Sequence, residues 1–201
     1  MTKDLKGSVD NDSPSPNVLK VILAFRTWGW VGFWSQVVLG VIAAIVLLVF
    51  VGTRAISGAV NTPAPTNVNP GTLPGLGFAW VGLAIVCLSI YWNFRYTQLS
   101  KKLRSPDRPN RAQTIRLLKI GIVISLAGML ITLIGAFTIV GWLTAKSQQQ
   151  QPGVGVLMVV PVQSIDLLVV QANTNIILAH FAGLVTSLWL LNRVTGKSSR
   201  E

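Results

Sequence analysis

Four polar residues near the end of the sequence recur at every seventh position: Asp166, Asn173, His180 and Ser187. Seven residues make about two turns of an α-helix, so these four side chains fall on nearly one face. A carboxylate, an amide and an imidazole supply oxygen and nitrogen atoms that can act as ligands of a metal ion. We therefore predict His180 and Asp166, the former the only histidine of the chain, as metal ligands.

The polar face broadens toward one end of this segment, where Gln171 and Asn175 join it. Polar groups are costly in hydrocarbon unless they find partners, so the face should point into a helix bundle, a subunit interface or a wet cavity. The predicted transport pathway consists of His180, Asn173, Asn175, Gln171 and Asp166. Two other interpretations stay open, because such residues also fasten neighbouring membrane helices together or contact lipid or another protein at an interface.

The elements that must position these residues are long apolar segments. Hydrophobic residues make up 51% of the 201 residues and charged residues only 11%, against about 25% in a soluble domain. Each apolar segment approaches the roughly 20 residues that cross a bilayer. We predict an all-α integral membrane protein with a four-helix membrane domain over residues 25–194 and tails at 1–24, expected to be disordered, and 195–201. The predicted spans are 28–51, 76–94, 120–143 and 167–191.

The distribution of Lys and Arg predicts the orientation of these spans. Of the 17 Lys and Arg residues, only Arg54 and Lys146 lie outside the N-terminal tail, the second loop and the C-terminal tail. Cytoplasmic loops carry the excess of Lys and Arg in membrane proteins, so both termini are expected on the cytoplasmic side. The same argument attributes the net charge of +11 to topology and to anionic lipid headgroups, and not to nucleic-acid binding.

Small residues form seams along the spans. The third span carries one at steps of four and three residues, which allows helix backbones to approach closely. The first span has a similar strip that includes Gln36. The seam of the third span comprises Gly121, Ser125, Gly128, Thr132 and Gly135. We expect a tightly packed four-helix bundle.

Motifs that carry enzymatic chemistry are absent from the sequence. It has no glycine-rich phosphate loop, no His-Glu-x-x-His and no nucleophile motif with a histidine partner. We therefore expect no enzymatic activity and no bound cofactor. One histidine and one aspartate cannot alone build a six-ligand iron cage, although an oligomer would bring several copies together.

Three segments resemble a chloroplast inner-envelope family that has cyanobacterial relatives. They are Phe25–Phe50, Arg111–Ser147 and Ser164–Phe181, the last reading SIDLLVVQANTNIILAHF. The most specific element is the Gln-Ala-Asn-Thr-Asn run from Gln171 to Asn175, followed by His180. Plant members of this family are described both as an iron permease and as a component of the protein-import translocon. Cyanobacterial members are grouped under a domain of unknown function.

The resemblance implies a membrane protein with iron as its substrate, or a scaffold, assembly factor or translocation component of a membrane complex. The polar N-terminal segment does not read as a signal or transit peptide, so we expect a cyanobacterial member in an inner (plasma) or thylakoid membrane. Expected partners are the lipid bilayer, further copies of the chain or a membrane complex, and a metal ion. The family supplies no agreed ligand residues.

Overall fold

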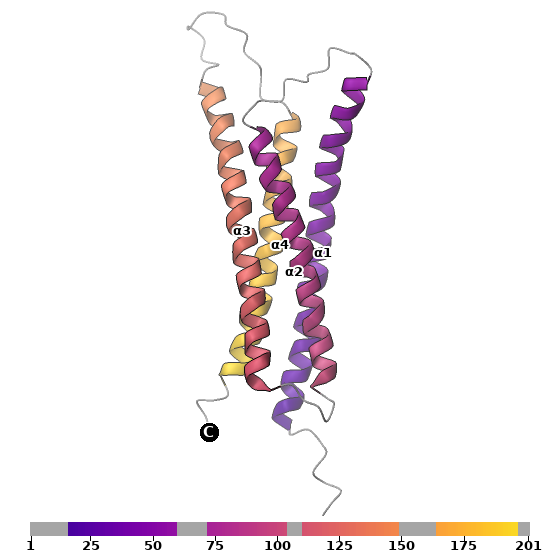
Figure 1. Ribbon diagram of the computed structural model, residues 1–201, viewed down its shortest axis with the longest axis vertical. Coiled ribbons are helices and arrows are strands. Elements are labelled where there is room, and N and C mark those ends of the chain that lie inside the picture. Colours follow the sequence, from indigo (N-terminus) through magenta and orange to yellow (C-terminus); the bar gives the residue numbers. More distant parts are fainter. Residues whose placement is uncertain (1–15, 60–71, 104–109, 149–163, 197–201) are drawn as a thin grey trace, which may run out of the picture.

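The protein is an up-and-down bundle of four long helices (Figure 1). The computed structural model describes residues 16–59, 72–103, 110–148 and 164–196. The helices are α1 (Pro16–Ala59), α2 (Thr72–Lys102), α3 (Arg111–Gln148) and α4 (Ser164–Thr195), and the described residues contain no strand. Each helix is long and apolar enough to cross a membrane. The predicted fold class, an all-α protein with four transmembrane helices, is confirmed.

The helices extend beyond the apolar segments that predict them. α1 begins at Pro16, ahead of the predicted membrane domain, and the predicted tail 1–24 otherwise lies outside the described residues. Proline fits the first turn of a helix because its missing N–H has no partner there in any case. Hydropathy marks only the part of a helix that lies in hydrocarbon. An existing helix continues past that part readily, because each added residue forms one further hydrogen bond.

The four helices form a ring in which one pair of opposite helices is also in contact. Each contacts its neighbours in the order α1, α2, α3, α4, and α4 also closes the ring against α1. α2 and α4 touch across the middle, whereas α1 and α3 do not contact each other in the described parts. α4 is the most enclosed span, with 44% of its most apolar stretch buried against 28% for each of the others. This placement fits the composition of that stretch of α4, whose mean hydropathy is the lowest of the four.

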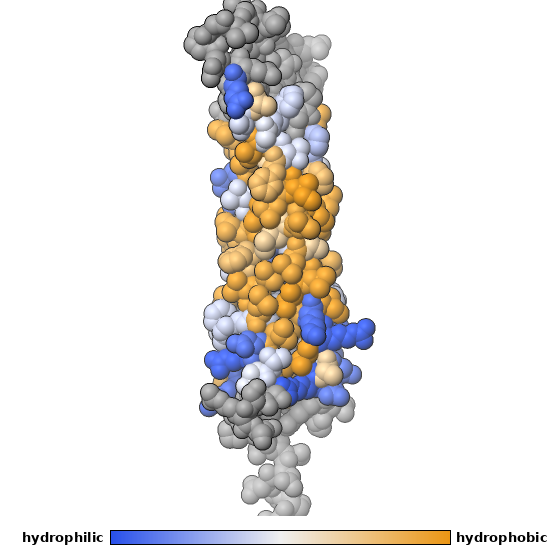
Figure 2. Space-filling model, turned by 90° about the vertical axis from the view of Figure 1, so that its left-hand side faces the viewer, coloured by the Kyte–Doolittle hydropathy of each residue, from blue (hydrophilic) through white to orange (hydrophobic). Residues whose placement is uncertain are grey.

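The face of the bundle that Figure 2 shows is apolar along the middle of its length, where the residues form an orange band. Large hydrophobic side chains such as Phe137 (73% exposed), Val123 and Leu130 point outward from α3. An apolar surface of this extent on four membrane-length helices is a surface for lipid. The lipid bilayer is therefore a partner of this chain.

Cationic side chains gather at one end of the bundle, which we call the basic end. The start of α1, the end of α2, the start of α3 and the end of α4 all lie there (Figure 1). The basic end carries the described cations Lys20, Arg26, Arg95, Lys101, Lys102, Arg111, Arg116, Lys119 and Arg193. The side chains of Arg54 and Lys146 lie outside the described set, and the cytoplasmic orientation of the basic end stays a prediction.

Candidate functional site

The inward face of α4 carries a column of buried polar side chains. Asn173 and His180 are fully buried and Ser187 nearly so, at 0%, 0% and 2% exposure. From Asn173 to Ser187 the helix rises about 21 Å, which is most of the roughly 30 Å hydrocarbon core. The seven-residue spacing thus places these groups inside the bundle, where α2 and α4 approach each other.

His180 lies between α2 and α3. Its Nε2 is 3.3 Å from the carbonyl oxygen of Gly82, a hydrogen bond in the tautomer that protonates Nε2. The imidazole ring lies against the backbone of Gly128, and any side chain at that position would collide with it. Nδ1 of His180 is buried and has no hydrogen-bond partner among the described residues. The glycine of α3 therefore provides the space for the ring, and one ring nitrogen is left unpartnered.

One helical turn toward the basic end, Gln36 connects three helices. Its Nε2 donates to Ser89 Oγ on α2 (2.7 Å) and to the carbonyl oxygen of Ala179 on α4 (3.0 Å). Asn93 Nδ2 donates to Gln36 Oε1 at 2.5 Å. Ser125 on α3 lies 3.5 Å from Ser89, so all four helices contribute to this group, which we call the glutamine node.

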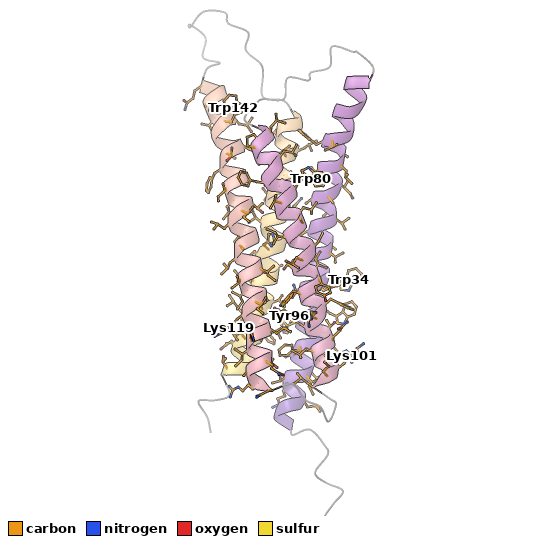
Figure 3. All side chains as sticks on the ribbon, viewed as in Figure 1. Trp34, Trp80, Tyr96, Lys101, Lys119 and Trp142 are labelled. Atoms are coloured by element: carbon orange, nitrogen blue, oxygen red, sulfur yellow. The ribbon has the colours of Figure 1, made fainter. Side chains whose placement is uncertain are left out.

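The column ends near the basic end at Tyr96 of α2. Its hydroxyl lies 3.1 Å from Ser187 Oγ, so one of the two donates to the other. The glycine at 121 makes room for this hydroxyl, since a Cβ there would overlap it. Figure 3 labels Tyr96 within the bundle on this half of the molecule. Gly121 and Gly128 of the α3 seam thus each accommodate a polar side chain from another helix.

The other seam residues also face inward. Thr132 is fully buried and donates to the carbonyl oxygen of Gly128 at 2.7 Å. A Cβ at Gly135 would overlap Phe78 of α2, so the two helices are in close contact there. Together with Ser125 in the glutamine node, the seam is the surface by which α3 packs against α2 and α4.

The predicted pathway residues of α4 divide into two groups. Asn173, Asn175 and His180 are buried, whereas Gln171 is exposed on the outside of the bundle. The side chain of Asp166 lies outside the described set. The structure thus brings Asn173 and His180 into the column and directs Gln171 away from it, because residues 171 and 173 are about 200° apart around a helix.

Four buried polar atoms lack a hydrogen-bond partner in the described structure. They are Asn93 Oδ1, Asn173 Oδ1, Asn175 Nδ2 and His180 Nδ1. The first two offer oxygen lone pairs, and Nδ1 offers a nitrogen lone pair when Nε2 holds the proton. No group of three His, Cys, Asp or Glu that could hold a metal occurs among the described residues. A cation in this column would therefore contact single amide, imidazole and carbonyl groups in succession.

Sequence reasoning missed Asn93 and Tyr96 as members of the column and treated Gln36 as part of a packing strip. The sequence did contain a signal for Asn93 and Gln36, because a side-chain amide inside an apolar span is rare and usually faces the interior of the bundle. Tyr96 gave no such signal, since tyrosine near the end of a span is typical of the membrane interface.

Four lipid-facing helices around a column of buried polar groups define a multi-pass membrane protein. The comparisons give the family: residues 15–195 match the model of the protein family of unknown function DUF3611, and the chain belongs to this family. The chain is also 33% identical over 191 residues to Protein TIC 21, chloroplastic, from Arabidopsis thaliana. That alignment covers 88% of this chain and 58% of the plant protein. No solved structure matches the chain.

Proposed function

We propose that this protein is permease-like and moves iron, or a related transition-metal cation, along the interior of the bundle. The observation that supports this function is the column from Asn173 through His180 to the glutamine node. It contains buried oxygen and nitrogen atoms without partners, at Asn173 Oδ1, His180 Nδ1 and Asn93 Oδ1. Lone pairs of this kind replace the water of a cation that leaves its hydration shell.

Under this proposal the cation moves from one binding position to the next, and no position surrounds it with a full set of protein ligands. Asn173 and His180 lie seven residues apart, which is about 10 Å along the helix, so one ion contacts one of them at a time. Asp166, about one further step of 10 Å toward the end opposite the basic end, would attract the ion. Weak binding at several sites favours conduction, because an ion must leave each site as readily as it enters.

Passage also requires the bundle to open, because the side chains around the column are closely packed. α1 and α3 do not touch each other in the described parts, so either can shift outward without disturbing the other. Gly128 and Gly183, which face His180 and Gln36, present no side chain of their own, so the helix backbones approach the column closely there. The proposal includes no catalytic step and no resident cofactor.

The test is uptake of iron and manganese into proteoliposomes that contain only this protein. We expect flux above that of empty liposomes, and we expect His180→Ala and Asn173→Ala to lower it toward that background. Thr174→Ala is the matched control, because Thr174 is an exposed polar residue of the same helix whose hydroxyl donates to the carbonyl oxygen of Val170, one turn earlier in α4. Undiminished flux in both variants, at equal protein content, would remove the column from the mechanism.

A second function is favoured by the glutamine node itself. Gln36 joins α2 and α4, and Ser89 approaches Ser125 of α3, so the polar groups hold the four helices as one rigid unit. A rigid unit suits a scaffold, assembly factor or translocation component of a membrane complex, or a homo-oligomer. This function predicts a large partner in mild detergent and no flux in proteoliposomes. Variants at His180 would then lose the partner and not a metal.

We place the protein in an inner (plasma) or thylakoid membrane, with the basic end in the cytoplasm. The proposal draws on the likeness to Protein TIC 21, chloroplastic, and the chain spans 58% of that relative's length.

A further inference from the structure

A pocket of about 390 Å³ opens between α1 and α2 at the basic end, apart from the polar column. One face of α1 and one face of α2 form its two walls. The lining residues are Ile22, Arg26, Trp30, Phe94, Thr97, Gln98, Ser100 and Lys101. Its volume is in the range of pockets that enclose a small molecule.

The pocket is polarised along the membrane normal. Gly29 of α1 lies against Thr97 of α2, which fixes the antiparallel register of the two helices. By that register Arg26 lies level with Ser100 and beside Lys101, whereas Trp30 lies one turn nearer the bilayer centre. Phe94 lies at that deeper level, and its ring contacts Phe33 at 6.0 Å between centroids. The cations therefore lie toward the basic end and the aromatic rings toward the hydrocarbon.

The two cations of the pocket are free to bind a ligand. Among the described residues neither Arg26 nor Lys101 makes a hydrogen bond or an ion pair, and both are exposed. Three other cations of this end are engaged. Arg95 lies over the Trp92 ring (5.3 Å), Arg193 lies over the Trp189 ring (4.9 Å), and Arg111 donates to the carbonyl oxygens that end α4.

The hydroxyl groups of the pocket do not compete for this role. Thr97 Oγ1 donates to the carbonyl oxygen of Phe94 at 2.7 Å, and Ser100 Oγ donates to that of Thr97 at 2.6 Å. Their protons are therefore already committed to backbone acceptors. The donors left for an anion are the Arg26 guanidinium, the Lys101 ammonium and the Gln98 amide, and guanidinium pairs well with a phosphate in bidentate geometry.

We propose that this pocket binds one anionic phospholipid, with its phosphate-bearing headgroup between Arg26 and Lys101 and an acyl chain against Trp30 and Phe94. Charge and depth together select this occupant. A soluble anion would find two cations but would leave the aromatic wall unused, and a neutral lipid would leave the cations without a counter-charge. The order of charged and apolar groups matches that of an amphiphile lying in a bilayer. Figure 3 shows Lys101 pointing outward at this end with Trp34 of the same side lying deeper.

The test measures lipid binding to the delipidated full-length protein in neutral detergent by native mass spectrometry. The probes are phosphatidylglycerol, phosphatidylcholine and inorganic phosphate, and the variant is Arg26→Gln with Lys101→Gln. The matched control is Arg116→Gln with Lys119→Gln, which removes the same charge from exposed positions of α3 at the same end. Melting temperatures of all variants check that they fold.

We expect one tightly bound phosphatidylglycerol in the wild type and about 10-fold or greater weakening in the pocket variant. The control should bind as the wild type does, and phosphatidylcholine should bind less tightly. Equal weakening in the control would assign the binding to diffuse charge and overturn the proposal. Equal binding of phosphatidylcholine would overturn it as well. Phosphate that displaces the lipid at equal concentration would identify a soluble-anion site and also overturn it.

Discussion

The single residue that does most to connect the helices is Gln36, an amide in the middle of an otherwise apolar helix. A glutamine has two donors and two acceptor lone pairs, and this one uses them toward Ser89, Ala179 and Asn93. Gly183 of α4 lies directly against its amide, so a larger residue there would displace it. Because the node is enclosed by protein, losing one partner leaves the others buried without a hydrogen bond.

We predict that Gln36→Leu destabilises the folded bundle by about 1–3 kcal/mol, because Asn93 Nδ2 loses its acceptor and stays buried. The measurement is thermal or denaturant unfolding in detergent. Gln171→Leu is the matched control, since Gln171 is exposed on the outside of α4 and should tolerate an apolar side chain. Adding Asn93→Leu to Gln36→Leu should restore part of the loss, because both partners are then apolar. Equal stability of the two single variants would contradict the role of the node.

At the scale of elements, the α3 seam decides how closely α3 approaches α4. The glycines of α3 have different surroundings according to whether they belong to the seam. Gly128 lies against the His180 ring, whereas Gly141 has nothing within 4 Å of the place where a Cβ would stand. The seam is therefore a packing surface, whereas the glycine at 141, beyond the seam, is free to change.

We predict that Gly128→Ala lowers the stability of the bundle by about 1–3 kcal/mol, because the added methyl displaces the imidazole in a close-packed interior. Gly141→Ala should be neutral or stabilising, since alanine is the better helix former by about 1 kcal/mol and meets no neighbour. Melting temperatures of the two variants make the comparison. If both substitutions shift the melting temperature alike, the close approach of α3 to His180 is wrong.

At the scale of the whole molecule, charge is segregated along the long axis. The described side chains include no carboxylate, so the cations of the basic end have no acidic partner within the described part of the chain. Their preferred neighbours are water, anionic lipid and the negative ends of α2 and α4, whose last turns carry Lys101, Lys102 and Arg193. By the tendency of Lys and Arg to remain on the cytoplasmic side, this segregation predicts the orientation of the molecule in the membrane.

We predict that the basic end faces the cytoplasm and the far end of α3 faces the opposite side. The variant Gln148→Cys, at the last residue of α3, should react with a membrane-impermeant maleimide on intact cells. Cysteine at Asn192, exposed near the end of α4, should react only after the membrane is opened. A Cys87→Ala background removes the native thiol, which lies exposed on α2. The reverse labelling pattern would invert the topology.

The fold was largely predictable because hydropathy measures, for each residue, the free energy of transfer from water into hydrocarbon. Four apolar segments of this length are long enough to cross the bilayer as helices. The helix ends were less predictable. α1 extends to Pro16 and Ala59, since helical hydrogen bonds continue past the point where the apolar sequence stops.

The sequence by itself determined the four helices, the clustering of cations at one end and the polar face of α4, since each depends on residue types along one helix. The tertiary structure decided which polar groups meet: Gln36 with Asn93, Tyr96 with Ser187, and His180 with Gly82. It also placed Gln171 on the outside of the bundle, and it brought Arg26 and Lys101 into the lining of one pocket. The physical reason is that periodicity fixes the direction of a side chain around its own helix, whereas the register between helices depends on how their side chains interlock.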